Sequence, residues 1–311
     1  MSQSGATLSL RNTAFWRTGR WAEALGGHLD EAPKGFPPVD FSRPVGDPGI
    51  LGPESVSWRI NANPVALFTG GIAAVLFELA EPRVRAGVWH HSGFRSDPVG
   101  RLRRTGMTAM VTTYGARADV EVVTARVRDM HGRVRGTTPE GNPYDACDPE
   151  LLRWVFTTAR WGLLEGYVRY VNPRLSSMDR DRYHAEGCMV APYYGVDNPP
   201  ASAATAHAYL QAMEPRLSGH PALREFLALL SRAPVLTRTA LPIQRLLIRA
   251  GMDLVPVWAQ TKLQLDVSRS FQVPRALLTR RVASLAGNII PRPARQACRR
   301  VGLAVNRLGT S

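Results

Sequence analysis

Lysine is nearly absent from this chain: Lys34 and Lys262 are the only two in 311 residues, and arginine supplies almost all of the positive charge. Cysteine is also scarce, since only Cys147, Cys188 and Cys298 are present and they stand far apart. Three widely spaced cysteines fit neither a disulfide framework nor a CxxC metal site. A reducing environment is therefore expected.

Acidic residues are missing from the last part of the chain. Residues 267–311 hold nine arginines and no aspartate or glutamate, so they carry nine of the fourteen excess positive charges. The remaining residues show no zinc finger or other nucleic-acid motif, and no nucleic-acid partner is expected for them. We expect residues 286–311 to form a basic C-terminal tail that is solvated or makes peripheral contact with anionic lipid.

Long apolar runs are missing too. The most apolar stretch, 65–80, is interrupted by Gly70, Gly71 and Glu78 and falls short of the roughly 20 residues that a membrane span needs. The N-terminal residues lack the continuous apolar segment of a secretory signal. A soluble, cytoplasmic protein is expected.

The sequence shows no credible alternating strand and no internal repeat, whereas helical spacing of apolar residues recurs throughout. These patterns predict an all-α protein with an N-terminal arm (1–55), one helical domain (56–285) and the basic tail. The arm holds a short helix at 13–25 and a Pro/Gly-rich part at 33–53 that drapes over the main body. The expected helices of the domain cover 65–80, 82–89, 99–113, 118–134, 151–170, 201–213, 222–231, 241–254, 257–265 and 274–285, and one more, capped within 177–182, carries Tyr183 and His184.

The helix at 65–80 is expected to lie at the centre, because it is apolar on nearly every side. Asn63 is a good N-cap residue for it, and Pro64 suits its first helical position.

A second helix, at 118–134, carries His131 on an apolar stripe formed by Val120, Val123, Val127, Met130 and Val134. A buried imidazole needs a partner, because an unpaired polar group costs about 1–3 kcal/mol. A metal, a backbone carbonyl or a carboxylate would each serve.

Two basic residues precede this helix at a matching spacing. Arg101 stands four residues before Thr105, and Arg104 stands four before Thr108, so a helix would present both pairs on adjacent ridges. Arginines and hydroxyls beside an apolar helix suit an anionic ligand, and they equally suit a solvated helix end.

Several motifs occur together in one order over about residues 49–270, and their central part is fairly specific. They are GILGPESVSWR (49–59), NP (63–64) with GG (70–71), LAEP (79–82), AGV (86–88), HS (91–92), DPxGRLxRT (97–105), VRDMHGRVRG (127–136), YxAxDPELLxWV (144–155) and LVPVW (254–258). In this combination the chain resembles the rubber oxygenases (latex-clearing proteins) and the MpaB-like oxygenases.

This resemblance implies a globin-like helical core that holds heme b, with His131, in the motif H-x-x-V-x-G, as the axial iron ligand. Arg101 and Thr105 match the family's R-x-x-[KR]-T pair and would act at the heme propionates or near the distal face. Arg104 stands where rubber-cleaving members carry a lysine that caps the iron; since arginine stays protonated, an open or water-bound distal site is implied. Glu81 stands where many relatives have histidine, a departure whose effect the sequence does not reveal.

The resulting expectation is a heme-dependent oxygenase that uses dioxygen or peroxide to oxidise a small apolar organic substrate. Rubber-cleaving relatives are typically exported, so a small intracellular metabolite, such as a natural product, is expected rather than a polymer. Two alternatives stay open. One is a non-catalytic heme- or lipid-binding protein on the same fold, and the other is a basic protein that binds nucleic acid or membrane through its arginine-rich tail.

Overall fold

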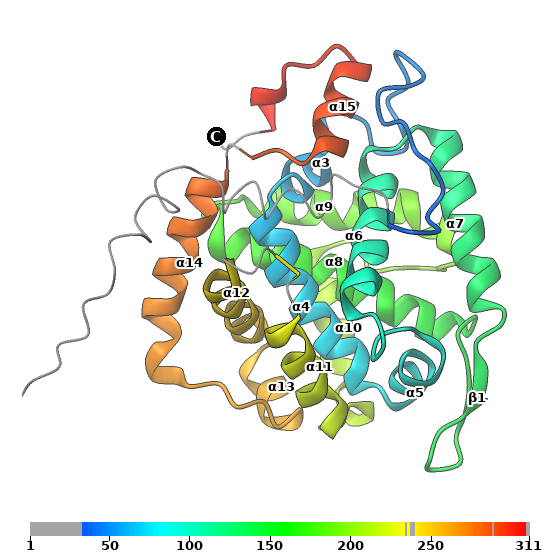
Figure 1. Ribbon diagram of the computed structural model, residues 1–311, viewed down its shortest axis with the longest axis vertical. Helices are drawn as coiled ribbons and strands as arrows, with labels where there is room; N and C mark the ends of the chain where they lie inside the picture. The colour runs from blue at the N-terminus through cyan, green and yellow to red at the C-terminus, as the bar shows by residue number, and fades with distance from the viewer. Residues whose placement is uncertain (1–32, 234, 237–239, 288, 309–311) are drawn as a thin grey trace, which may run out of the picture.

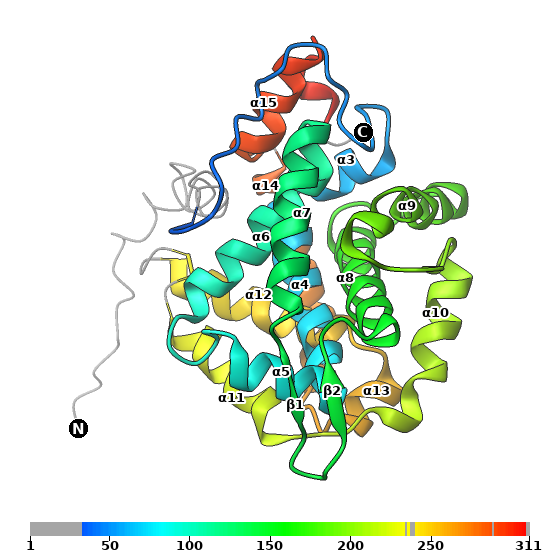
Figure 2. The same ribbon diagram turned by 90° about the vertical axis from the view of Figure 1, so that its right-hand side faces the viewer.

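Helix α4 (Pro64–Ala80) runs through the centre of the molecule, with other helices on several sides of it (Figures 1 and 2). A computed structural model describes the protein from residue 33 to residue 308, leaving aside 234, 237–239 and 288. The predicted cap is confirmed, because the Asn63 side chain accepts hydrogen bonds from the backbone N–H groups of Val65 and Ala66 at 3.0 and 3.1 Å. The short helix predicted at 13–25 lies outside the described residues.

Small residues bring α4 against α8 (Pro149–Tyr170) at very short range. A Cβ atom placed on Gly70 would lie 2.3 Å from the carbonyl oxygen of Gly162, and one on Gly166 would lie 2.7 Å from that of Ala66. Real side chains do not tolerate such distances, so these glycines allow the two backbones to touch. The α4–α8 pair forms the centre of the domain, and the other helices pack around it.

The remaining helices confirm the all-α, single-domain prediction, while the globin-like arrangement stays a prediction. Around the central pair lie α3 (Val56–Asn61), α5 (Pro82–His91), α6 (Pro98–Tyr114), α7 (Arg117–His131), α9 (Ser177–Val190), α10 (Ala203–Ala212), α11 (Pro221–Arg232), α12 (Leu241–Leu254), α13 (Val257–Lys262), α14 (Gln272–Ala286) and α15 (Arg292–Arg300). Within the described ranges, no single helix is long and apolar enough to cross a membrane; only α4 and α5 taken together would be, and they meet at a bend of 105°.

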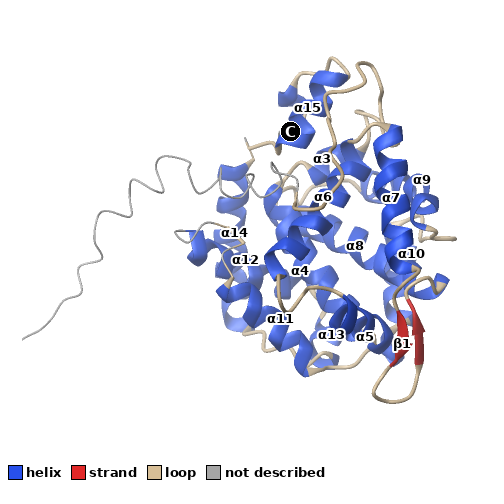
Figure 3. Cartoon of the chain, turned by 45° about the vertical axis from the view of Figure 1, so that its right-hand side comes forward, coloured by secondary structure: helices blue, strands red, loops and turns tan. Residues whose placement is uncertain are grey.

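The prediction that no strand is present was wrong at one place. Residues 135–145 form a short antiparallel hairpin of β1 (Arg135–Thr137) and β2 (Pro143–Asp145), shown in red in Figure 3. Gly141 takes φ = 87° in the connecting loop, a conformation that glycine adopts freely. Strands of three residues are too short to show an alternating pattern, which explains why the sequence did not reveal them.

The expectation of a solvated C-terminal tail was also wrong. Helix α15 buries Ala294, Ala297 and Cys298 in a cluster with residues of the N-terminal arm and of α6. Arg300 is only 1% exposed, and its guanidinium donates hydrogen bonds to the carbonyl oxygens of Phe41, Asp47 and Tyr114 at 2.8–3.1 Å. The buried residues recur at helical spacing, so this arginine-rich segment forms an amphipathic helix. This helix joins the arm to the C-terminal end of α6 (Figure 2).

Candidate functional site

One stripe of the central helix is incompletely buried. Leu67, Gly71, Val75 and Glu78 are partly exposed, whereas most other residues of α4 are buried. Their spacing of four, four and three residues places them on one side of the helix, which we call the open face of α4. A Cβ atom added to Gly71 would find no atom within 4 Å. There is therefore free space beside the middle of a helix that is otherwise enclosed.

The open face of α4 is turned toward α6 and α7. Leu67, at one end, packs against the apolar cluster that includes Met110 of α6 and Val123 of α7. Glu78, at the other end, interacts electrostatically with Arg101 of α6. Helices α6 and α7 pack on each other, but neither is among the helices that pack closely on α4. We infer that Gly71 faces a region bordered by α4, α6 and α7.

Glu78 and Arg101 form the charged end of this region. Burial raises the pKa of the Glu78 carboxyl to about 7, and the positive charge of Arg101 offsets part of that rise. Burial likewise lowers the pKa of Arg101, against the opposing effect of Glu78. No ion pair joins the two side chains at contact distance among the described residues. A carboxyl with a pKa near 7 exchanges its proton readily at neutral pH.

His131 ends α7, and its surroundings differ in part from the prediction. Val120 and Val123 are buried as expected, but Met130 is 56% exposed and His131 is partly exposed. The apolar stripe of α7 is therefore buried in its first half alone. The predicted burial of Met130 was wrong, because residues 128–130 in the last turn of α7 lie at the surface.

The imidazole of His131 nevertheless has an unsatisfied buried atom, since Nδ1 is shielded from solvent and has no hydrogen-bond partner in the described part of the chain. Burial, and then the charge of Arg101, lower the pKa of His131. The ring is therefore neutral at pH 7 and keeps a lone pair, which is the form that binds a metal. In the described part of the chain no three His, Cys, Asp or Glu side chains gather around a metal site. An iron held in a porphyrin takes only axial ligands from the protein.

Arg101 is oriented by the other residue of its predicted pair. Its guanidinium Nη1 donates to the Thr105 hydroxyl, which in turn donates to the Arg101 carbonyl oxygen at 3.1 Å. Arg104, by contrast, points to the surface, where its guanidinium lies 3.5 Å from the Asp97 carboxylate and is 39% exposed. The structure thus brings Arg101, Glu78 and His131 together and leaves Arg104 at the rim.

Sequence reasoning noted Glu78 only as an interruption of an apolar run and missed it as a site residue. The signal was present, because a carboxylate on a helix that is otherwise apolar has either a partner or a function. Glu81, whose role the sequence left open, is structural: it caps α5 by accepting from the Val84 N–H at 2.8 Å and pairs with Arg83 at 2.9 Å.

Comparison with protein families places these helices in a known group. A family model described as "ER-bound oxygenase mpaB/B'/Rubber oxygenase, catalytic domain" matches residues 58–288. The chain belongs to this family. The matched range includes α4, α6 and α7, so the open face of α4 lies inside an oxygenase catalytic domain. No curated protein and no solved structure matched the chain.

Proposed function

We propose that this protein is a heme b-dependent oxygenase that oxidises a small apolar organic compound, a natural product being one such class. The observation that carries the proposal is the free space beside Gly71, together with the His131 ring nitrogen that has no partner among the described residues. The charge of Arg101 acts on both Glu78, on the same face of α4, and His131. A flat porphyrin would fill such a space, and a neutral imidazole would hold its iron.

The surroundings suit the two kinds of surface that heme presents. Leu67 and Val75 give the open face of α4 apolar side chains for the porphyrin ring. Arg101 lies within electrostatic range of His131, and Arg104 within range of Arg101. Guanidinium groups pair well with carboxylates, so these arginines would hold the propionates or assist at the oxygen-binding side.

Heme b, when bound, supplies an iron that activates dioxygen or peroxide. The chain contributes the surroundings of that chemistry. The apolar side chains of α4 exclude water from the substrate, and Thr105 holds the Arg101 guanidinium in one orientation. Glu78 accepts or releases a proton at its carboxyl, because burial keeps its pKa near neutral.

The experiment that tests this function is oxygen uptake by heme-loaded protein offered a panel of small apolar alkenes and aromatic compounds. At least one compound is expected to raise oxygen consumption above the rate without substrate. Arg101→Gln is expected to lower that rate on the order of 100-fold, because an aligned charged donor contributes mainly to the reacting state. The control is Arg126→Gln, which changes an exposed arginine of α7 and should leave the rate unchanged.

Two results would count against the function. Heme-loaded protein that consumes no oxygen with any compound would favour the non-catalytic heme-binding alternative. An Arg101→Gln rate equal to that of Arg126→Gln would remove Arg101 from the site.

A further inference from the structure

Helix α14 (Gln272–Ala286) buries its small side chains and exposes its large apolar ones, which is the reverse of what is expected of a core helix. The face that it packs against α12 and α4 consists of small or medium residues, namely Ala276, Thr279, Val282, Ala283 and Ala286. The larger apolar residues in and just before α14 point outward and are each more than half exposed: Phe271, Val273, Leu277, Leu278 and Leu285. A helix that serves only the protein core buries its largest side chains.

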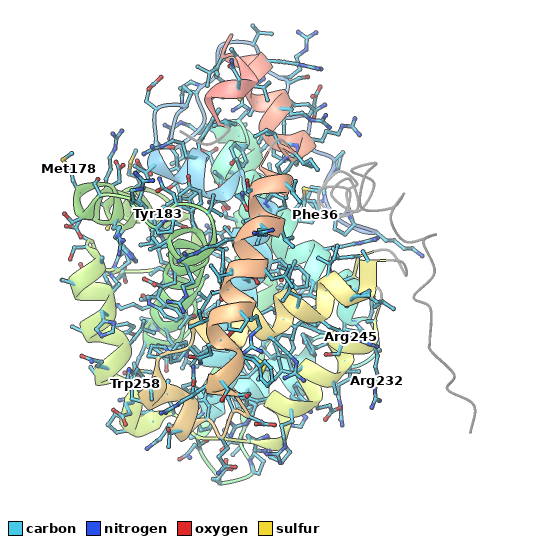
Figure 4. The ribbon with its side chains drawn as sticks, turned by 90° about the vertical axis from the view of Figure 1, so that its left-hand side faces the viewer. Phe36, Met178, Tyr183, Arg232, Arg245 and Trp258 are labelled. Carbon is cyan, nitrogen blue, oxygen red and sulfur yellow. The ribbon has the colours of Figure 1, made fainter. Side chains whose placement is uncertain are left out.

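Single exposed leucines are common, but several within one helix form a patch that calls for a partner. Leu277, Leu278 and Leu285 recur at spacings of one, seven and eight residues, so they lie along one side of α14. Figure 4 shows α14 in front, crossing this side of the molecule, with no other described helix over it. We call this surface, formed by the five residues, the outer face of α14.

The charges around the outer face are mainly positive. Arg269, just before the face, and Arg281, between Leu278 and Leu285, are exposed, and neither forms an ion pair with a described residue. Arg245 of α12 and Arg232 at the end of α11 extend from the same side of the molecule (Figure 4). Asp253, the acidic residue of α12, is bound by Arg275. Asp266 is exposed just before this face, and no acidic residue follows it.

We propose that the outer face of α14 docks on an anionic lipid membrane. Apolar side chains flanked by arginines that pair with no described carboxylate suit the interface of such a membrane, where the apolar groups enter the acyl boundary and the guanidinium groups meet lipid phosphates. A second copy of the chain fits less well, because a symmetric contact would double the positive charge on this face, with Asp266 its nearest exposed carboxylate in the chain. The basic residues of α15 are not needed for this contact.

The test is sedimentation of the full chain with phosphatidylcholine vesicles that contain phosphatidylserine, compared with pure phosphatidylcholine vesicles. Binding is expected to the anionic vesicles, and to weaken as salt is raised. The double variant Leu277→Ser with Leu278→Ser should reduce the partition constant roughly tenfold or more. Arg281→Gln should reduce it roughly fivefold.

A matched control replaces exposed apolar residues on another helix. Met178→Ser with Met189→Ser alters α9, where both methionines are more than half exposed, and should leave vesicle binding unchanged. Since all of these side chains are exposed, thermal unfolding should be similar in the two double variants. A Leu278→Trp chain should show a blue shift of its tryptophan emission when anionic vesicles are added.

Equal binding to both kinds of vesicle, no binding to either, or equal loss in the α9 and α14 variants would overturn the proposal. A wild-type dimer that dissociates in the α14 double variant would assign the outer face to a second copy and overturn it as well. None of these outcomes depends on heme or on oxygen uptake, so this inference and the proposed function stand or fall separately.

Discussion

A Gly71→Leu chain is expected to fold as the wild type does and yet to lose nearly all of its heme binding. The new side chain would enter the free space on the open face of α4, where a Cβ atom meets nothing within 4 Å. Leucine is also a better helix former than glycine, so the heme-free protein should gain up to about 1 kcal/mol in its free energy of unfolding. Hemin titration together with urea unfolding measures both effects.

The neighbouring glycine supplies the control, because the opposite result is expected there. Gly70→Ala would place a Cβ atom 2.3 Å from the Gly162 carbonyl oxygen, and backbone on both sides has no room to move. The free energy of unfolding should fall by about 3 kcal/mol or more. If Gly71→Leu binds heme as tightly as the wild type, the cofactor does not lie on the open face of α4.

Glu78→Gln is expected to remove a pH dependence from the stability of the heme-free protein. Burial raises the pKa of the Glu78 carboxyl from 4.5 to about 7, so the folded protein holds a proton that the unfolded chain has released. The wild type should therefore lose up to about 3 kcal/mol as the pH rises from about 4.5 to about 7, and the loss should persist above that window.

Glutamine resembles the protonated carboxyl, so the Glu78→Gln chain should match the wild type below about pH 4.5 and exceed its stability at about pH 8. Urea unfolding at a series of pH values measures the difference, with Glu121→Gln on the exposed side of α7 as the control. Parallel stability curves for the wild type and Glu78→Gln would show that the surroundings of the Glu78 carboxyl do not raise its pKa.

Local signals in the sequence were sufficient for much of the fold. The cap at Asn63, the proline at position 64 and the largely apolar run that follows gave the limits and the central place of α4, because each depends only on nearby residues. The order of the motifs around His131 and Arg101 gave the family, which the match over residues 58–288 confirmed.

Features that depend on distant contacts could not be predicted in the same way. Arg300 appeared as one more charge of a basic tail, because its three carbonyl partners lie about 190–260 residues away in the sequence. The electrostatic link between Glu78 and Arg101 joins two helices that only the folded chain brings together. The different roles of Gly70 and Gly71 follow from their surroundings in the folded protein. Two adjacent glycines do not reveal in the sequence which of them contacts another helix.

The measurement that tests the central claim most directly is a hemin titration followed by absorption, with the wild type beside His131→Ala. The wild type should saturate with one heme per chain and show a sharp Soret band. In His131→Ala the band should be lost or displaced, and added imidazole should restore it, because the free ligand replaces the missing side chain. A well-folded wild type that stays colourless, or a His131→Ala spectrum identical to that of the wild type, would contradict the account.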